Sequence, residues 1–417
     1  MQNQQQTRGE FSLGWKVLLA SMLGVMCGAS PIPYNAIGFF IGPLNAEFGW
    51  SFRDISLGIT IFGVLAALLA PVFGAMADRF GVRPVALWSL FAFALAFAAL
   101  SFIPNSLIGY YLLWALVGLV GIGSTPVTWS RAVNLWFFRN RGLALGLTLV
   151  GTSLAAMIIP PLASWAIEAH GWRLAFPIIA LLPLLIALPV GYKLFREPRP
   201  DERPIELATT GNGGTLAGLT LREAIGSYRF HLLFVSILLI AFAYGGAHIH
   251  LPEMLRSHGL GEQAKWVASS LGLSLLAGRL ITGALIDRFW APAVTFPVLC
   301  MPVISCLLLA SDSLSLQMAF LAAFLLGFAA GAESDLIAYL AGRYFGMAHY
   351  GKIYGMLYIP FGIASALSPA AYGWVRDSTG SYDPMLAVAA VLFVAGASLL
   401  LGLGRYPDFR SPTRIEA

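Results

Sequence analysis

Long apolar runs separated by short polar connections cover almost the whole chain. Each run has about the 20 residues with which an α-helix crosses a hydrocarbon core about 30 Å thick. Twelve such runs lie near residues 15–41, 55–77, 84–104, 107–133, 142–167, 173–194, 230–252, 264–286, 292–310, 314–342, 351–374 and 384–404. The connection 195–229 is the only long polar one, and its prolines and glycines predict a flexible linker. The pattern predicts an all-α membrane protein with twelve transmembrane helices in two six-helix bundles.

Composition supports this class. Of the 417 residues, 58% are hydrophobic and only 11% are charged, with a mean hydropathy of +0.77, which no soluble domain shows. Cys27, Cys300 and Cys306 fall inside apolar runs, where a small buried thiol is expected and neither a disulfide nor a metal site. Residues 1–10 are polar and lack the apolar region of a secretory signal, so the first membrane helix itself is expected to direct insertion.

Lysine and arginine predict the orientation. One side of the predicted bundle collects Arg8, Lys16, Arg79, Arg83, Arg139, Arg141, Lys193, Arg196, Arg199, Arg203, Arg222, Arg229, Arg288, Arg343, Lys352, Arg405, Arg410 and Arg414. The other side collects Arg53, Arg173, Arg256, Lys265 and Arg376. By the positive-inside rule, both termini and the linker are expected in the cytoplasm and the protein in the cell (inner) membrane. The net charge of +5 reflects this asymmetry and does not indicate a nucleic-acid partner.

The two halves of the chain repeat. An offset of 209 residues takes Asp78 to Asp287, and the same offset takes Gly142 to Gly351, Gly146 to Gly355 and Pro160 to Pro369. Two sequential copies of one six-helix unit explain this spacing, with bundles expected over 1–194 and 230–417. Such repeats are typical of transporters, whose substrate site lies at the interface of the repeats near the membrane midplane.

One cation lies deep within an apolar run. Arg279 is eight residues before Asp287, which with Arg288 marks the polar exit, and is therefore about 12 Å from that exit. An arginine near the bilayer centre costs at least about 2.5–3.5 kcal/mol and normally faces a bundle interior or a wet cavity. Because its planar guanidinium suits a carboxylate, we expect Arg279 to bind the carboxylate of a substrate. A structural cation bonded to carbonyls or to a neighbouring acid is the alternative.

Two acids lie at a similar depth in the run 314–342. Asp335 is eight residues before Arg343, and Glu333 is slightly deeper. Positions two apart on a helix point in roughly opposite directions, so the acids cannot easily share one partner. We expect one of them to pair with Arg279 and the other to couple a proton to transport. A static buried ion pair is the alternative.

Aromatic and amide side chains are candidates for a cavity wall. Pro31 and Pro33 interrupt the first helix beside Tyr34 and Asn35, and broken helices are tolerated where they line a cavity. Tyr244 lies 209 residues after Asn35. Other expected substrate contacts are Trp129, Tyr358 and Phe361. For all of these, packing between helices or against lipid is the alternative.

Two further groups lie near the helix ends. Arg131 is about one turn inside the cytoplasmic end of its helix, either as a gate cation or as an anchor that reaches the interface. His248 and His250 are two residues apart, which is poor geometry for a zinc pair. His250 is a candidate for an outer gate, with an interfacial histidine as the alternative.

A glycine-rich charged motif follows the second predicted helix. Gly74-Ala75-Met76-Ala77-Asp78-Arg79-Phe80-Gly81-Val82-Arg83 resembles the cytoplasmic motif of the major facilitator superfamily, and the chain resembles that family along its whole length. The resemblance implies that Asp78, Arg79 and Arg83 form a charge latch at the cytoplasmic gate, which breaks as the halves rock.

The second copy of this motif is less complete. Asp287 and Arg288 are expected to latch the gate in the other half. After Phe289, however, Trp290-Ala291 stands where the family has glycine and a basic residue, so the second latch departs from the motif.

Within the superfamily, the chain most resembles the monocarboxylate porter and oxalate/formate antiporter branch. The residues that carry this likeness are Trp136-Phe137-Phe138-Arg139-Asn140-Arg141-Gly142-Leu143-Ala144-Leu145-Gly146, Pro160-Pro161, Gly171-Trp172-Arg173 and, above all, Arg279. In that branch an arginine on the eighth membrane helix, which corresponds to the run 264–286 here, binds the substrate carboxylate. This arginine lies eight residues before the cytoplasmic aspartate, and the resemblance implies the same role for Arg279.

Departures from the branch narrow the substrate. The run after Gly351 has no cation at depth to serve as a second carboxylate partner, and the first helix has no lysine near Tyr34. One central cation suits one carboxylate, so a dianion is disfavoured. Thr152 follows Gly151 where the family's antiporter motif has a proline, which disfavours drug/proton exchange.

The sequence offers no phosphate-binding loop, metal-ligand spacing or serine elbow, so we predict no catalytic residue, metal or cofactor. We predict a secondary active transporter of a small organic monoanion, a monocarboxylate, that works by alternating access with proton symport. An anion exchanger or a dicarboxylate carrier is the alternative, and a non-transporting membrane sensor is a further one. The expected partners are the carboxylate substrate, protons and bilayer lipid, and the expected state is a monomer.

Overall fold

The computed structural model describes residues 10–137, 141–198, 218–286, 288–346 and 349–407, and nearly all of them are helical. The helices are α1 (Glu10–Met26), α2 (Pro31–Phe48), α3 (Phe52–Phe80), α4 (Val82–Ala99), α5 (Leu107–Gly121), α6 (Pro126–Trp136), α7 (Arg141–Leu182), α8 (Leu188–Leu194), α10 (Leu221–Gly226), α11 (Tyr228–Ser257), α12 (Ala264–Ile286), α13 (Ala291–Leu309), α14 (Leu316–Phe345), α15 (Tyr350–Thr379) and α16 (Asp383–Leu401). A π-helical turn, Pro183–Ala187, joins α7 to α8.

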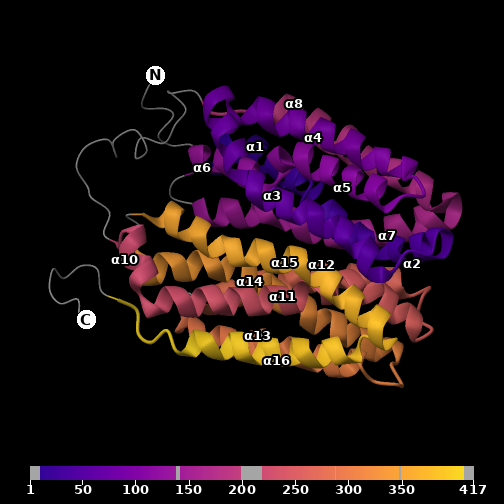
Figure 1. The fold of residues 1–417 in the computed structure, drawn as a ribbon. Helices are drawn as coiled ribbons and strands as arrows, with labels where there is room; N and C mark the ends of the chain where they lie inside the picture. The colour runs from indigo at the N-terminus through magenta and orange to yellow at the C-terminus, as the bar shows by residue number, and fades with distance from the viewer. Residues whose placement is uncertain (1–9, 138–140, 199–217, 287, 347–348, 408–417) are drawn as a thin grey trace.

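Eleven segments of the described chain are long and apolar enough to cross a membrane, where the sequence predicts twelve. The difference lies in the segment Leu143–Leu194, whose 52 residues would extend about 78 Å as one straight helix. Gly171 interrupts it with a φ of 79° and a ψ of 160°, a conformation that glycine adopts without steric cost. Figure 1 shows α8 back toward the end of the molecule at which α7 begins, so the chain reverses within this segment.

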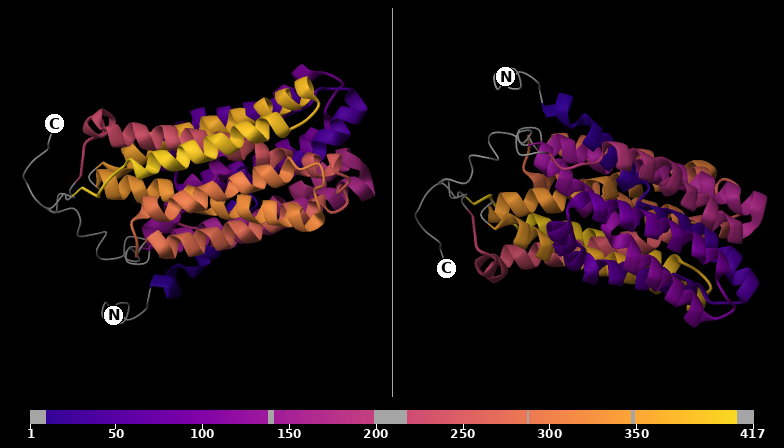
Figure 2. Two further views of the ribbon diagram at one scale, coloured as in Figure 1. Left: turned by 90° about the horizontal axis from the view of Figure 1, so that it is seen from below. Right: turned by 90° about the horizontal axis from the view of Figure 1, so that it is seen from above.

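The helices form two groups that follow the order of the chain. In Figure 1 helices α1 to α8 lie above α11 to α16. Figure 2 agrees, because α11 to α16 lie in front in the view from below and α1 to α8 lie in front in the view from above. Each group has its own apolar core. One core runs from Val17 to Ala187 with Ile249 and Ala268 added, and the other runs from Ala224 to Leu403.

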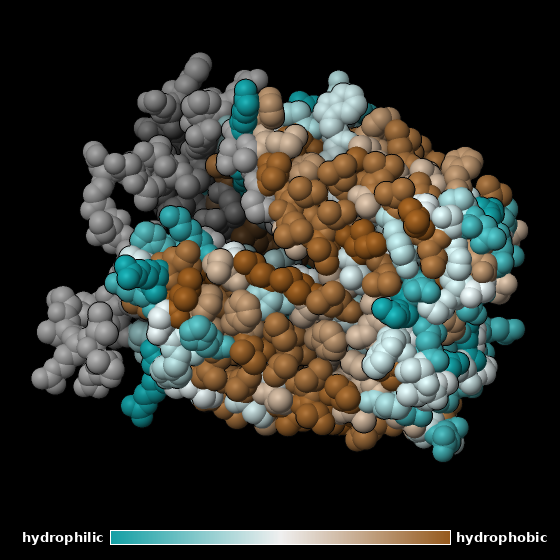
Figure 3. Space-filling model, in the orientation of Figure 1, coloured by the Kyte–Doolittle hydropathy of each residue, from teal (hydrophilic) through white to brown (hydrophobic). Residues whose placement is uncertain are grey.

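Charge distinguishes the two ends of the molecule. The end at which α1 begins, α10 lies and α16 ends is here called the basic end. Its described basic residues include Lys16, Arg79, Arg83, Lys193, Arg196, Arg222, Arg229, Arg288, Arg343, Lys352 and Arg405. Figure 3 shows a broad apolar surface over the helices with polar residues gathered toward both ends, as a protein that spans a bilayer requires.

The first membrane segment is broken as its prolines predict. Helix α1 ends at Met26 and α2 begins at Pro31, so the break precedes the prolines, which lack N–H donors and suit a helix start. The backbone N–H of Ala29 in the break donates to Ser124 Oγ at 3.1 Å. A side chain at Gly28 would collide with the Ser124 carbonyl, so the break packs directly on the turn after α5.

Both described ends of the connection between the halves are packed. Phe195 is buried and lies against Trp129, with 4.5 Å between ring centroids. On the other side, the Leu219 N–H donates to the Phe345 carbonyl at 2.8 Å, and Thr220 with Glu223 forms a capping box at the start of α10. The predicted flexibility therefore concerns residues 199–217, which lie outside the described residues.

Helices α12 and α14 approach so closely that their backbones touch. A Cβ at Gly278 would lie 2.0 Å from the Phe328 carbonyl oxygen, and a Cβ at Gly331 would lie 2.0 Å from that of Leu275. These two glycines therefore set the distance between the helix that carries Arg279 and the helix that carries Glu333.

We predict that Gly278→Ala destabilises the protein, because the added methyl group forces α12 and α14 apart, at a cost of about 1–3 kcal/mol. Gly283→Ala is the matched control on the same helix, since a Cβ there meets nothing within 4 Å. The control should be neutral or slightly stabilising, because alanine favours helix over glycine. Thermal unfolding of the two purified variants in detergent measures the difference, and equal unfolding temperatures would contradict the close contact.

Candidate functional site

Arg279 joins the two halves of the molecule at depth. Arg279 lies on α12 and is 8% exposed. Its Nη1 donates to the Leu149 carbonyl on α7 at 2.8 Å. Leu149 is eight residues after Arg141, the first residue of α7, which begins at the basic end. Arg279 is seven residues before Ile286, the last residue of α12. Both groups are therefore about 10–12 Å from the basic end. The guanidinium thus sits at the contact between the halves, bonded to a main-chain oxygen of the other half.

Glu333 is buried in the carboxy-terminal half, 5% exposed, and its Oε1 has no hydrogen-bond partner in the described part of the chain. Glu333 is two positions after Gly331, the glycine at which α14 contacts α12. Positions two apart point in roughly opposite directions, so the Glu333 side chain leaves α14 on a different side from α12. It also borders a void of about 10 Å³ lined mainly by leucine and isoleucine. Glu333 is therefore not the hydrogen-bond partner of Arg279. The side chain of Asp335 lies outside the described residues.

Two tyrosines lie near this acid, and a third lies near one of them. Tyr244 on α11 and Tyr358 on α15 are close enough to Glu333 for electrostatic interaction, and Tyr358 interacts in the same way with Tyr34 on α2. Tyr358 is 42% exposed as a residue. The structure thus brings together predicted residues from both halves, Tyr34 from the first and Tyr244, Tyr358 and Glu333 from the second.

An aromatic row runs along α15 toward this cluster. Ring centroids are 5.7 Å apart from Tyr350 to Tyr354, 5.8 Å from Tyr354 to Tyr358 and 5.1 Å from Tyr358 to Phe361. The residues three or four apart share one helix face. This row leads from the basic end to the depth of Glu333. Of this row, only Tyr358 and Phe361 are predicted from the sequence, although the spacing of Tyr350 and Tyr354 is a usable signal.

The other predicted contacts have mainly local partners. Asn35 donates from Nδ2 to the Pro31 carbonyl at 2.8 Å, which stabilises the start of α2. Trp129 is fully buried in the amino-terminal core, where its Nε1 donates to the Ser124 carbonyl at 3.0 Å. Neither side chain is brought to Arg279 by a contact in this structure, and their substrate role stays a prediction.

The predicted gate residues are only partly described. Asp287 lies outside the described residues, as does the side chain of Asp78. Arg83 donates from Nη2 to the Tyr192 carbonyl at 2.5 Å, a contact within its own half that also caps the end of α8. Arg79 and Arg288 are exposed at the basic end, and Arg131 is half-buried on α6.

The end opposite the basic end is closed by contacts between the halves. The backbone N–H groups of Phe52 and Arg53 donate to the Asp377 carboxylate at 3.1 and 2.8 Å. These are the first residues of α3, whose N–H groups have no partner within the helix, so Asp377 caps α3 from the other half. On the other side of the interface, Lys265 at the start of α12 lies 3.3 Å from Glu168.

His250 adds a buried contact near the same end. Its Nε2 lies 2.9 Å from the Pro369 carbonyl and 3.2 Å from Ser56 Oγ, and its Nδ1 lies 2.9 Å from the Tyr382 hydroxyl. A carbonyl only accepts, so Nε2 carries the proton and Nδ1 accepts from Tyr382. Because Ser56 is on α3, this histidine links the halves, as an outer-gate residue would.

The contacts of Glu168 and Asp377 follow the internal repeat, but no local sequence pattern predicts them. Glu168 and Asp377 are separated by the same 209 positions that relate the two halves. Each reaches the beginning of a helix in the other half, α12 and α3 respectively. Only the alignment of the repeats could have linked them in advance.

Comparisons with known proteins give a consistent result. A sequence profile described as Major Facilitator Superfamily matches residues 19–369. Monocarboxylate transporter 13 of Bos taurus is 27% identical, over 96% of this chain and 91% of its own length. A probable sulfoacetate transporter, SauU, of Cupriavidus necator is 26% identical, over 90% of this chain and 91% of its own length.

A solved structure shares the fold. It is a bacterial homologue of the human lysosomal transporter Spinster, in an inward-facing and unoccupied conformation. The TM-score is 0.69 at 17% identity, covering 96% of this chain and all of that one.

We predict that Asp377→Ala loosens the contact between the halves at the end opposite the basic end. Loss of a charged cap of about 1 kcal/mol would shift the ratio of open to closed molecules about fivefold. Spin labels at Asn105 and Ser313, on exposed loops of the two halves, would report this as a longer distance population. Asp312→Ala removes an exposed acid at the same end and is the control. An unchanged distance distribution in Asp377→Ala would contradict a closing role.

Proposed function

Because the chain belongs to the Major Facilitator Superfamily, we propose that this transporter carries a small organic monoanion, a monocarboxylate, by alternating access and in symport with protons. The family, and relatives named monocarboxylate transporters, support the class of protein. The substrate, the coupling and the residues below are our proposal.

The observation that carries the proposal is Arg279. A cation at this depth is stable only with an electron-rich partner, and here it has the Leu149 carbonyl. A carboxylate is a stronger partner than a carbonyl, because both guanidinium N–H groups of the fork bond it and the charges attract. A substrate carboxylate can therefore take over this bond at the contact between the halves. Tyr34, Asn35, Trp129, Tyr244, Tyr358 and Phe361 are the proposed residues around the rest of the substrate.

The two acids of α14 then have separate roles. An ionised carboxyl in an apolar interior is costly unless it is paired, and a bound proton removes that charge. Glu333, buried with Oε1 unbonded within the described residues, is our proposed proton carrier. Asp335 is four positions after Gly331, and the helical repeat favours that face for a partner of Arg279.

Access to the site is proposed to alternate between the two ends. The contacts of Asp377, Glu168 and His250 support a state that is closed at the end opposite the basic end. We infer that in this state the site is open to the cytoplasm at the basic end. In the opposite state, the proposed latches would hold the basic end closed. These latches are formed by Asp78, Arg79, Arg83, Asp287 and Arg288, with Arg131 as a gate cation.

The balance of charge supports the proposal of proton symport. A carried monoanion that enters the cell opposes an inside-negative potential of about 2.3 kcal/mol per charge for each 100 mV, and one proton cancels that cost. In this proposal Arg279 binds the anion and Glu333 carries the proton, both buried, so that the pair moves without net charge.

We further propose twelve membrane spans. The reversal at Gly171 divides Leu143–Leu194 into two spans, which raises the eleven segments to twelve. The proposed domains are the bundles 1–194 and 230–417, joined by the cytoplasmic linker 195–229. The excess of Lys and Arg at the basic end favours cytoplasmic termini in the cell (inner) membrane. Each half has its own core, so a monomer is sufficient.

A second candidate is exchange or uptake of a dianion. The relative named a probable sulfoacetate transporter favours it, since sulfoacetate carries a carboxylate and a sulfonate. Countertransport of a preloaded dianion without dependence on pH would support this reading.

We predict that Arg279→Lys raises KM for the carboxylate about tenfold or more, because lysine keeps the charge and loses the planar two-donor fork. Arg279→Gln should abolish uptake. The measurement is initial uptake of a panel of radiolabelled monocarboxylates into proteoliposomes with an acid-outside gradient. Arg222→Lys is the control, because Arg222 is an exposed arginine outside the proposed site and gates. Normal uptake by Arg279→Gln would contradict binding of the substrate carboxylate by this arginine.

We predict that Glu333→Gln loses gradient-driven accumulation while it retains exchange of labelled for unlabelled substrate, because exchange needs no change in protonation. Asp335→Asn should impair both, since Arg279 would lose its proposed partner. The same proteoliposomes, with and without a pH gradient, separate these outcomes. Proton-linked uptake that is unchanged in both variants would exclude coupling through α14.

A further inference from the structure

A recess at the basic end holds three arginines. Its volume is about 740 Å³, and it lies among the end of α12, the start of α13, the end of α14 and the chain after α16. The lining residues are Ile286, Arg288, Phe289, Trp290, Arg343, Gly404, Arg405 and Tyr406. It lies among the helix ends, away from Arg279 and Glu333, and of its residues only Arg288 has a role in the proposed transport mechanism, in a gate latch.

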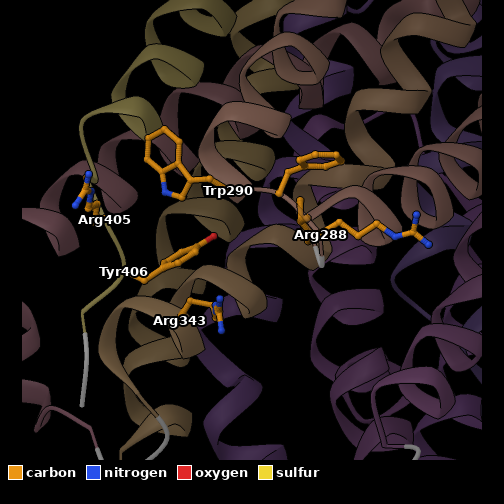
Figure 4. A pocket seen from close by; sticks show the side chains of 8 residues that line it. Arg288, Trp290, Arg343, Arg405 and Tyr406 are labelled. Carbon is orange, nitrogen blue, oxygen red and sulfur yellow. The ribbon is translucent and has the colours of Figure 1, made fainter. Parts of the chain in front are cut away.

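Aromatic rings hold the guanidinium of Arg343. Arg343 lies over Tyr406 at 4.4 Å and over Tyr339 at 5.8 Å from the ring centroids. Figure 4 shows Arg343 and Arg405 on either side of Tyr406, with Arg288 extending away at the rim. Within the described residues, none of the three arginines has a hydrogen bond or an ion pair to an acid. A ring occupies only the face of a guanidinium and leaves its in-plane donors for an anion.

The neighbouring polar groups are already bonded. Trp290 Nε1 donates to the Tyr344 hydroxyl at 3.2 Å, and the Ala291 N–H donates to the Tyr406 hydroxyl at 2.9 Å. The arginines are therefore the main donors that the recess offers. Clustered positive charge at the start of α13, where the helix dipole is also positive, favours a bound anion.

An apolar path leaves the recess along α12. Ile281 and Leu285 on α12 and Phe289 just after its end are exposed at intervals of four residues, so they form one stripe. By the helical repeat this stripe is turned away from Arg279 and its contact with α7, toward the lipid side. A free anion has no use for such a stripe, whereas the acyl chain of a lipid does.

We propose that this recess binds the phosphate headgroup of an anionic phospholipid from the leaflet at the basic end. The phosphate accepts hydrogen bonds from Arg343 and Arg405, Arg288 adds positive charge at the rim, and an acyl chain follows the stripe from Phe289. Basic pockets between membrane helices on the cytoplasmic side are suited to such headgroups. The lipid would tie α12, α13, α14 and the chain after α16 to one another.

The test is to titrate the purified full-length protein in neutral detergent with phosphatidylglycerol. The unfolding temperature of the protein is measured at each lipid concentration. The wild type should show a saturable rise. Arg343→Gln/Arg405→Gln should need about 25-fold more lipid for half the rise, about fivefold for each arginine. Arg222→Gln/Lys352→Gln removes the same charge from exposed positions at the same end and should respond as the wild type does. Arg405→Gln alone, which disturbs no ring contact of Arg343, should show the fivefold effect.

Two further arms identify the source of the phosphate. Phosphatidylcholine should give no saturable rise, and inorganic phosphate should give none at millimolar concentration. An equal rise with inorganic phosphate would overturn the lipid assignment in favour of a soluble phosphate. An unchanged titration in both arginine variants, or an equal loss in the control, would overturn the site itself. Lipid binding is read without transport, so its outcome is independent of the proposed function.

Discussion

The cost of placing a positive charge inside a membrane governs this structure. Arg279 can stay at its depth because it is buried between the halves and bonds a backbone oxygen of α7. That requirement fixes which face of α12 meets the amino-terminal half. It also places a strong anion-binding group at the boundary that must rearrange if the halves move. One energetic demand therefore determines both the packing and the proposed chemistry.

The two halves meet through paired devices that follow the internal repeat. Glu168 and Asp377 occupy equivalent positions, and each holds the start of a helix in the other half. Such contacts are polar and near the surface, where an exposed ion pair is worth at most about 1 kcal/mol. Contacts this weak can break and reform, whereas the apolar core within each half cannot. The structure thus separates what is permanent from what is reversible.

The sequence predicts the fold well because the bilayer leaves few choices. The run predicted near 264–286 coincides with α12, and the prolines after Ser30 correctly predict a broken first helix. The site is predicted only in part. Charged residues such as Arg279 and Glu333 stand out in apolar runs, but a backbone carbonyl such as that of Leu149 looks like every other in the sequence. The reach of Asp377 to α3 also depends on how the halves dock, which no local pattern encodes.

The glycine contact between α12 and α14 has a mechanical consequence. Because the two backbones touch at Gly278 and Gly331, no side chain separates them and neither helix can slide past the other without a clash. Arg279 and Glu333 therefore travel as parts of one rigid body, and the distance between their attachment points stays constant. The variable element is the Leu149 carbonyl on the other body. In the proposed cycle this oxygen acts as a built-in competitor of the substrate, because it holds the guanidinium when the site is empty and must yield when a carboxylate arrives.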